Sequence, residues 1–386
     1  MIPYGRQDIR EEDIDAVVSV LKSDFLTQGP MVPAFENRVA SHVGSKFAVA
    51  VNSATSALHI ACLALDLQKG DVLWTTPITF VASANCALYC GAAIDFVDIN
   101  PKTYNISVEK LEEKLIFAQS RGILPKILVA VHLCGEPCEM EKISALSKKY
   151  GFKIIEDASH AIGGKYKNSF IGSNHYSDIT VFSFHPVKII TTAEGGMALT
   201  NNALLDQRLR LLRSHGITRD EASMTHQPDG PWYYQQIELG YNYRMTELQA
   251  ALGLSQMDRL DLYVQTRHQL AKRYQDLLRD LPLSAQQLDP ESYSGLHLYV
   301  IRLDKNAIKN THLEVFNDLR ASGIGVNLHY IPVHLQPYYK KLGFTPNSYP
   351  EAEKYYSEAI SIPLYYGMSE SQQDQVVQAI SKAVGA

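Results

Sequence analysis

The sequence predicts an α/β fold in which helices flank a mostly parallel, doubly wound sheet and a smaller α+β region follows. Three observations lead to this prediction. Short β-rich runs alternate with helical stretches between residues 47 and 200. The run ILVAV at 127–131 is apolar throughout, as expected of a strand covered on both faces. After residue 245 the pattern changes to a long helical stretch and then to shorter segments of both kinds.

The first 43 residues are predicted to form two helices ahead of the sheet. In EEDIDAVVSVLK, residues 11–22, apolar side chains recur at helical spacing and acidic residues fill the first turn. Gly29 and Pro30 are expected to break the helical pattern, and a second helix is expected from Pro33 to about Val43. Seven strands follow, at Phe47–Val51, Val72–Thr75, Ala93–Val97, Ile127–Val131, Lys153–Glu156, Ile179–Phe184 and Gly196–Thr200, with helices at 55–67, 79–90, 107–119 and 139–150.

The C-terminal third is predicted to begin with one connecting helix from Thr246 to about Leu278, whose length is typical of a link between domains. Beyond it we expect strands at Leu296–Leu303 and Val326–Tyr330, a helix at Thr311–Ser322 and a C-terminal helix. At roughly 150 residues per domain, 386 residues suffice for two or three domains. We therefore expect a large domain over residues 1–250 and a connector helix with a small domain over 251–386.

Composition excludes several classes of protein. The net charge of -5, from 36 basic and 41 acidic residues, is not that of a nucleic-acid-binding protein. Apolar runs are too short for a membrane helix, and the N-terminus lacks the features of a signal peptide. Five cysteines are few and odd in number, which is typical of reduced thiols. We expect a cytoplasmic protein with neither nucleic-acid nor membrane partners.

Candidate ligand-binding residues fall at the carboxyl ends of predicted strands, where open α/β sheets bind ligands. NSATSAL, residues 52–58, combines small residues and hydroxyls with a helix N-terminus, a combination suited to an anion. The alternative is an ordinary helix cap. In IIEDASHA, residues 154–161, Asp157 could hold a protonated ring nitrogen and His160 could orient the same ring, although a cap followed by a surface histidine has the same pattern.

A lysine and an asparagine complete the set. In VFSFHPVKIITTAEGG, residues 181–196, Ser183 ends a strand and Lys188 lies between apolar residues. Apolar surroundings lower a lysine pKa and favour a nucleophilic amine, whereas a snorkelling lysine is the common alternative. GYNYRM, residues 240–245, places Asn242 at the entry to the connecting helix. A lysine amine, an acidic partner for a ring nitrogen and an anion site together fit pyridoxal 5′-phosphate (PLP).

In order and spelling these segments resemble the DegT/DnrJ/EryC1/StrS family of sugar-nucleotide aminotransferases. The resemblance runs from LTQGP near residue 26 to HYIPVH at 329–334, and SFHPVKIITTAEGG is its most specific motif. The residues of these motifs are most similar to those of family members that act in pseudaminic acid biosynthesis. The resemblance implies the PLP-dependent transferase fold of type I. It also implies transfer of the amino group of L-glutamate to carbon 4 of a UDP-linked 4-keto-6-deoxy-N-acetyl hexose.

The resemblance also implies roles for individual residues. Lys188 matches the lysine that forms a Schiff base with PLP and moves the substrate proton, and Asp157 matches the carboxylate that keeps the ring nitrogen protonated. Phe80 matches the aromatic residue stacked on the ring, and His160 matches a residue beside Asp157. The phosphate would be held by Ala54, Thr55, Ser183 and, from the neighbouring subunit of a homodimer, Asn242. The sugar nucleotide would contact Tyr4, Asp24, Phe25, Leu26, Thr27, Asn327, Leu328, His329 and Tyr330.

Alternative functions differ from this one in identifiable features. Another nucleotide keto sugar, of different epimer or nucleotide or aminated at carbon 3, is compatible with the same motifs. Family dehydratases carry histidine where Lys188 stands. A non-catalytic PLP-fold binding protein also stays open. Metal sites at Cys86 and Cys90, or at Cys134 and Cys138, would need further clustered ligands, so no metal is expected.

Overall fold

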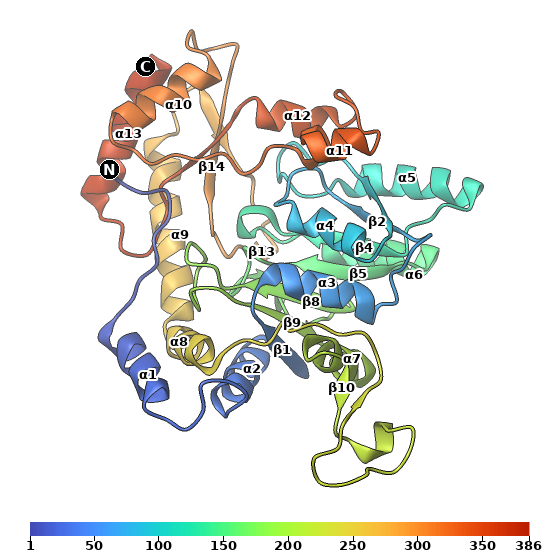
Figure 1. Ribbon diagram of the computed structural model, residues 1–386. Coiled ribbons are helices and arrows are strands. Elements are labelled where there is room, and N and C mark those ends of the chain that lie inside the picture. The colour runs from blue at the N-terminus through green and yellow to red at the C-terminus, as the bar shows by residue number, and fades with distance from the viewer. Residues whose placement is uncertain (386) are drawn as a thin grey trace.

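A seven-stranded sheet forms the centre of the molecule in a computed structural model that describes residues 1–385 (Figure 1). Its order is β1-β9-β8-β5-β4-β2-β3. Neighbours are parallel from β8 through β3, whereas β9 is antiparallel to both β1 and β8. The mostly parallel sheet predicted from the sequence is confirmed. The strands are β1 Phe47–Val51, β2 Val72–Thr75, β3 Ala93–Phe96, β4 Ile127–Val131, β5 Lys153–Asp157, β8 Ile179–Ser183 and β9 Gly196–Thr200.

Helices cover both faces of this sheet, which explains why β4 is buried along its whole length. One apolar cluster joins a sheet face to α2, α5 and α6, and a second joins the opposite face to α3, α4 and α7. Burying apolar side chains on both faces removes a large area from water and holds the layers together. These helices are α2 Met31–Val43, α3 Ala54–Ala64, α4 Ala82–Tyr89, α5 Val108–Arg121, α6 Met140–Tyr150 and α7 Ala203–Arg213.

The predicted single connecting helix is wrong, because two helices take its place. These are α8, Glu247–Met257, and α9, Leu260–Leu277. The backbone leaves helical geometry at Arg259, whose guanidinium donates to both carboxylate oxygens of buried Asp13 at 2.6 Å. Asp13 belongs to α1, Glu11–Leu21, which packs along α8. The break lets α8 lie against the large sheet's helices while α9 turns toward the C-terminal part (Figure 1).

The C-terminal part contains a three-stranded antiparallel sheet in the order β12-β14-β15, covered by α10 and α13. A strand was expected over Val326–Tyr330, but in that segment only Asn327 pairs, through an isolated bridge to Ser361. The domain boundary expected after residue 250 falls inside α8 and stays a prediction. The elements are β12 Leu283–Ala285, β14 Tyr299–Leu303, β15 Ala359–Ile362, α10 His312–Ala321, α11 Pro337–Lys341, α12 Pro350–Tyr356 and α13 Glu370–Val384.

Short elements complete the fold. A two-stranded ribbon, β10 Ile217–Thr218 with β11 Gln235–Gln236, supports an arm that projects from the body (Figure 1).

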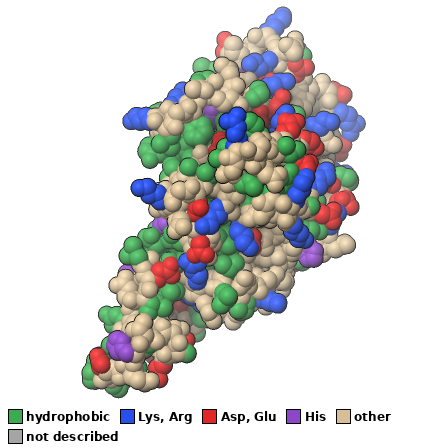
Figure 2. Space-filling view, turned by 90° about the vertical axis from the view of Figure 1, so that its right-hand side faces the viewer, with side chains coloured by type: hydrophobic (Ala, Val, Ile, Leu, Met, Phe, Trp, Pro, Cys, Tyr) green, Lys and Arg blue, Asp and Glu red, His purple; other side chains and the backbone are tan. Residues whose placement is uncertain are grey.

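Apolar and histidine side chains gather at the lower end of the molecule in Figure 2, whereas charges of both signs mix over the body. No helix within residues 1–385 has the length and hydropathy to cross a membrane. The remaining elements are β6 Lys165–Tyr166, β7 Ser169–Phe170, β13 Ser292–Tyr293 and the 3₁₀ turns Leu133–Gly135, Glu221–Ser223 and Val333–Leu335.

Candidate active site

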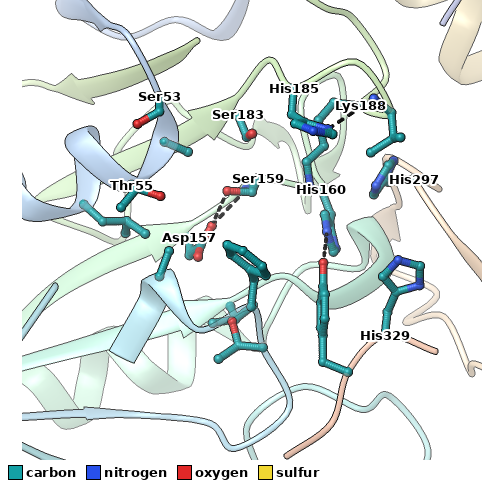
Figure 3. Close-up of a pocket in the computed structure, with 18 of the residues that line it drawn as sticks. Ser53, Thr55, Asp157, Ser159, His160, Ser183, His185, Lys188, His297 and His329 are labelled. Carbon is teal, nitrogen blue, oxygen red and sulfur yellow. Dashed lines mark hydrogen bonds between the residues drawn. The ribbon is translucent and has the colours of Figure 1, made fainter. Parts of the chain in front are cut away.

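A cavity of about 960 Å³ opens at the carboxyl edge of the large sheet. Its walls come from the segments that follow β1, β2, β5 and β8, and from the C-terminal part of the chain. Figure 3 shows Ser53 and Thr55 on one side, Asp157 and Ser159 in the middle, and His160, His297 and His329 toward Lys188. The sheet topology thus brings together side chains that lie far apart in the sequence, as expected for this class of sheet.

The N-terminus of α3 forms one end of the cavity. Ser53 caps this helix because its Oγ accepts from the backbone N–H of Ser56 at 3.1 Å. Ala54 and Thr55, in the first turn, line the cavity. Gly196 on β9 packs so closely beneath them that a Cβ there would lie 2.4 Å from the backbone nitrogen of Ala54. Gly196 thus allows β9 to approach the first turn of α3 closely. The backbone N–H groups of that turn face the cavity, and a helix N-terminus of this kind favours binding of an anion.

Lys188 is half-buried in the cavity wall, with buried Ile189 and Ile190 following it. Desolvation lowers the pKa of its amine to about 8, although the negative charge of Asp157 works in the opposite direction. At pH 7 such an amine is neutral in about a tenth of molecules, far more than for an ordinary lysine. The environment therefore favours nucleophilic amine chemistry.

Asp157 and Glu156 lie next to each other in β5 and point to opposite sides of the sheet, as strand geometry requires. Asp157 lines the cavity and accepts from Ser83 Oγ at 2.6 Å and from Ser159 Oγ at 2.6 Å. Glu156 instead bonds His132 Nε2 at 2.8 Å, away from the cavity. The structure therefore assigns the cavity carboxylate to Asp157 and gives Glu156 a structural place.

His160 is neutral in the cavity wall. Burial, and then the charge of Lys188, lower its pKa well below the ordinary value. Its Nδ1 accepts from the backbone N–H of Cys134 at 3.2 Å, which leaves the ring proton on Nε2. Nε2 then donates to the hydroxyl oxygen of Tyr330 at 3.2 Å. The ring of Phe80, exposed to the cavity, lies 6.1 Å from that of Tyr330.

The residues expected to contact a sugar nucleotide fall into two groups. Tyr4, together with the segment 327–330, lines the cavity. The segment 24–27 is exposed and lies outside the cavity lining. Asn242 is also exposed and outside it, held by a bridge to Ser214. Within one chain, the cavity therefore gathers the expected PLP-contacting residues except Asn242.

Sequence reasoning missed several cavity residues, of which His297 is the clearest. This side chain is 4% exposed and its ring centroid lies 4.5 Å from that of His160. Its Nδ1 has no hydrogen-bond partner among residues 1–385. SGLHLYV offers no local signal of this position, because His297 reaches the cavity only through the packing of the C-terminal part. Asn52, Thr79 and His185 also line the cavity, from the segments that follow β1, β2 and β8, and Gln249 lines it from α8; sequence reasoning gave none of these four a role in binding.

Comparison with known proteins identifies the family. The chain matches the DegT/DnrJ/EryC1/StrS aminotransferase family over residues 7–381. The protein belongs to this family.

Named relatives agree with that assignment. The UDP-4-amino-4,6-dideoxy-N-acetyl-beta-L-altrosamine transaminase of Campylobacter jejuni is 39% identical over 370 residues, 96% of this chain and 94% of the relative. PseC of Helicobacter pylori, an aminotransferase involved in pseudoaminic acid biosynthesis, superposes with a TM-score of 0.91 at 30% identity, covering 100% and 99% of the two chains. Spr1654 of Streptococcus pneumoniae in its PLP form gives 0.89 at 28% identity, covering 100% and 98%.

This family member is a sugar aminotransferase that uses PLP. The cavity fits that cofactor on three independent features. The helix N-terminus above Gly196 suits a phosphate, Asp157 suits a protonated ring nitrogen, and the amine of Lys188 suits a covalent bond to an aldehyde carbon. When bound, PLP withdraws electrons from the carbon that carries the transferred nitrogen.

Proposed function

We propose that this aminotransferase moves the amino group of L-glutamate to carbon 4 of a UDP-linked 4-keto-6-deoxy-N-acetyl hexose. The observation that carries the transaminase chemistry is the lowered pKa of the Lys188 amine beside Asp157 in one cavity. The likeness to the Campylobacter jejuni transaminase supports the choice of sugar. Five free cysteines support a cytoplasmic location.

We assign a separate role in the reaction to each group of residues that lines the cavity. Lys188 would hold the cofactor through its nitrogen, and its amine would take and return the proton at the reacting carbon of the substrate. Asp157 accepts hydrogen bonds from two hydroxyls, which fix its carboxylate in the cavity, where it would pair with a protonated ring nitrogen. The first turn of α3 would hold the phosphate, and Phe80, which lines the cavity, would lie against the ring.

His160 and Tyr330 orient the substrate side of the cavity. Because His160 donates its ring proton to Tyr330, the phenolic proton is left to donate elsewhere. Burial raises the pKa of Tyr330, so the group stays a neutral hydroxyl. A neutral donor at this place can bind a hydroxyl or carbonyl oxygen of the keto sugar.

We also infer that two copies share each active site. Within residues 1–385, Lys188 is the one Lys or Arg side chain that lines the cavity, yet glutamate and a nucleotide sugar are both anionic. Asn242 is exposed and lies outside its own chain's cavity. A homodimer in which Asn242 reaches the partner's phosphate site accounts for the exposed position of this amide, and the facing surface of the partner is where further positive charge for the anionic substrates would come from.

Substrate choice is tested by offering the holoenzyme L-glutamate with a panel of UDP- and dTDP-linked 3-keto and 4-keto sugars. Products are identified by mass spectrometry and NMR. The proposal expects fastest amination at carbon 4 of the UDP-linked 6-deoxy-N-acetyl sugar. Preference for another nucleotide or for carbon 3 would replace the substrate while leaving the transaminase assignment intact.

A Lys188→Ala variant is the control for this panel. It should lose at least roughly 100-fold in rate with every sugar, since a nucleophile and proton carrier is missing. Borohydride treatment of the wild-type holoenzyme should attach the cofactor to a peptide that contains Lys188. Attachment to another lysine, or normal turnover by the variant, would contradict the proposed chemistry.

A further inference from the structure

A buried histidine that takes no part in the cavity lies on α3. His59 is 5% exposed, and it is not among the residues between 1 and 385 that line the cavity. It belongs to the second turn of the helix, whose first turn, at Ala54 and Thr55, faces the cavity. Burying an imidazole costs free energy that the contacts of its ring must offset. Those contacts therefore indicate what His59 holds in place.

The ring of His59 contacts the two tyrosines that flank Asn242 in the chain. Its Nδ1 pairs with the hydroxyl of Tyr243 at 3.2 Å. Its ring centroid lies 4.8 Å from that of Tyr241 and 5.3 Å from that of Tyr89 on α4. The rings of Tyr241 and Tyr243 stack on each other, with centroids 4.9 Å apart and planes 15° from parallel. Both tyrosines therefore lie on the α3 side of their segment.

Asn242 points away from that side. It is exposed, whereas the tyrosines on either side of it are half-buried. Asn242 pairs with Ser214 through an antiparallel bridge, which is a contact of extended chain. Successive side chains of an extended chain point in opposite directions. With Tyr241 and Tyr243 turned toward α3, the amide of Asn242 is directed to the outer surface.

Backbone hydrogen bonds fasten the same segment to the beginning of α3. The N–H of Asn52 donates to the carbonyl oxygen of Tyr243 at 2.8 Å, and Asn52 directly precedes Ser53, the cap of the helix. The N–H of Tyr243 donates to the carbonyl oxygen of Arg213 at 3.0 Å. These bonds fix where the segment lies, and the contacts with His59 fix which way its side chains point.

We propose that His59 is a positioning residue for the cofactor site of the partner subunit. This role rests on the shared active site proposed above, in which Asn242 reaches the partner's phosphate site. By holding both tyrosines against α3, His59 keeps the amide of Asn242 aimed at the partner. The helix then serves two sites of the dimer, because its first turn faces the phosphate end of its own cavity and its second turn fixes the asparagine for the other.

A residue that only filled the space between α3 and α4 would have a different effect. Its loss would loosen the first turn of α3 and weaken the phosphate site of its own chain. Loss of a residue that acts through Asn242 would weaken the site of the partner instead. Because a homodimer of variant chains carries both effects in every site, mixed dimers are needed to separate the two roles.

Two mixed dimers of identical composition make this separation. Each contains one Lys188→Ala substitution, which leaves a single site able to bond PLP, and one His59→Leu substitution. In the trans dimer both substitutions are on one chain, so the remaining site receives its asparagine from the His59→Leu chain. In the cis dimer they are on different chains, so the remaining site belongs to the His59→Leu chain and receives an asparagine held by an intact His59. Differently tagged chains and two successive affinity steps isolate each dimer.

The measured quantity is the PLP dissociation constant of the remaining site, obtained by titrating dialysed dimers and following the absorbance of lysine-bound PLP. With Asn242→Ala in place of His59→Leu, the trans dimer should lose roughly tenfold or more in affinity, because a hydrogen bond to a charged phosphate is removed. With His59→Leu the loss should be roughly 3- to 10-fold, because the amide is still present but held less firmly. The cis dimer should stay within about twofold of a dimer that carries Lys188→Ala alone.

The mixed dimers also separate failure of this role from failure of the shared site. An equal loss in the trans and cis dimers, a loss in the cis dimer alone, or no loss in either would overturn the role of His59. If Asn242→Ala has no effect in trans, the shared active site itself is wrong, and the role of His59 falls with it. If Asn242→Ala acts in trans and His59→Leu does not, only the role of His59 is wrong.

Two milder substitutions keep the test decisive if His59→Leu chains fail to fold. Tyr243→Phe removes only the hydroxyl that pairs with His59 Nδ1 and keeps the stacked ring, so it should weaken PLP binding in trans, by a smaller factor, and not in cis. His59→Asn places an amide near the position of Nδ1 and should restore most of the affinity. Unchanged affinity in the Tyr243→Phe trans dimer, or a His59→Asn dimer as weak as His59→Leu, would contradict positioning through this hydrogen bond.

Discussion

Asp157 and Glu156 are adjacent in β5 but have different surroundings. We therefore expect different defects when each side chain is replaced by its amide. Asp157→Asn should lower kcat by roughly 100-fold or more, because the charge facing the ring nitrogen is lost. Glu156→Gln should keep near-normal kcat but lose about 1–3 kcal/mol of stability, because its buried bonds to His132 and Ser177 weaken. Steady-state kinetics and urea unfolding of both variants check this. Equal kinetic defects in the two would contradict the assignment of Asp157.

The protonation of Lys188 gives a second residue-scale prediction. In the cofactor-free protein, modification of Lys188 by trinitrobenzene sulfonate should rise with a midpoint near pH 8, since desolvation lowers the pKa of the amine to about 8. Asp157 raises that pKa, so Asp157→Asn should move the midpoint to lower pH. The rate is followed by peptide mapping across pH 6–10. A midpoint that moves upward in the variant would show that the two charges do not interact as described.

At the scale of elements, the break between α8 and α9 depends on one buried ion pair. Burial alone would raise the pKa of Asp13, but hydrogen bonds from Ser255, Arg259 and the backbone of Arg10 lower it. Because its pKa is lower in the folded state, the carboxylate stabilises the protein above its unfolded value of 3.8. That stabilisation is lost as pH falls through the folded pKa.

Asp13→Asn should therefore cost roughly 3 kcal/mol at pH 7, because the Arg259 guanidinium loses its charged partner in a buried place. The difference from wild type should shrink as pH drops below 4. Asp15→Asn, on the exposed face of the same helix, is the matched control and should change stability by less than about 0.5 kcal/mol. Urea unfolding at several pH values makes the measurement. A constant difference at all pH values would contradict the role of this charge.

Local pattern was sufficient for the large sheet and insufficient for elements that depend on long-range packing. ILVAV reads as a buried strand from its own residues, and β4 confirms it. Nothing local marks Arg259 as the end of a helical stretch, since Asp13 lies 246 residues away. The sequence VNLHY at Val326–Tyr330 looked like a strand, yet the segment passes along the cavity with a single bridge to Ser361.

The residues of the candidate site also fall into a group that local pattern predicts and a group that depends on long-range packing. Lys188, Asp157 and the first turn of α3 follow strands directly, so strand-end reasoning placed them in one cavity. His297 reaches the same cavity from the C-terminal part, and its position depends on how that part packs. The residues around His297 give no indication of how the C-terminal part packs, and this histidine was therefore missed.

At the scale of the whole molecule, complementation tests the shared active site. Lys188→Ala chains lack the amine but carry an intact Asn242, and Asn242→Ala chains have the opposite defect. A dimer of one chain of each kind contains one doubly damaged site and one intact site. An equal mixture allowed to exchange subunits should recover about a quarter of wild-type activity, since half of the dimers are mixed and each holds one good site.

Subunit exchange must be monitored independently, for example by native mass spectrometry of differently labelled chains. Mixing Lys188→Ala with Asp157→Asn is the matched control, because both residues line the cavity of their own chain and no mixed site is intact. Recovery in this control, or none in the test mixture despite exchange, would rule out sharing through Asn242.

The hydrogen bond between His160 and Tyr330 joins residues 170 positions apart, and this separation sets an order of events during synthesis. Lys188 is made 142 residues before Tyr330 (330 − 188 = 142). At about 5–20 residues per second the ribosome needs roughly 7–30 s to cover that distance. During this interval the amine lies in a half-built cavity open to cellular aldehydes. Stable capture of PLP is therefore expected only after the C-terminal strands have emerged and docked.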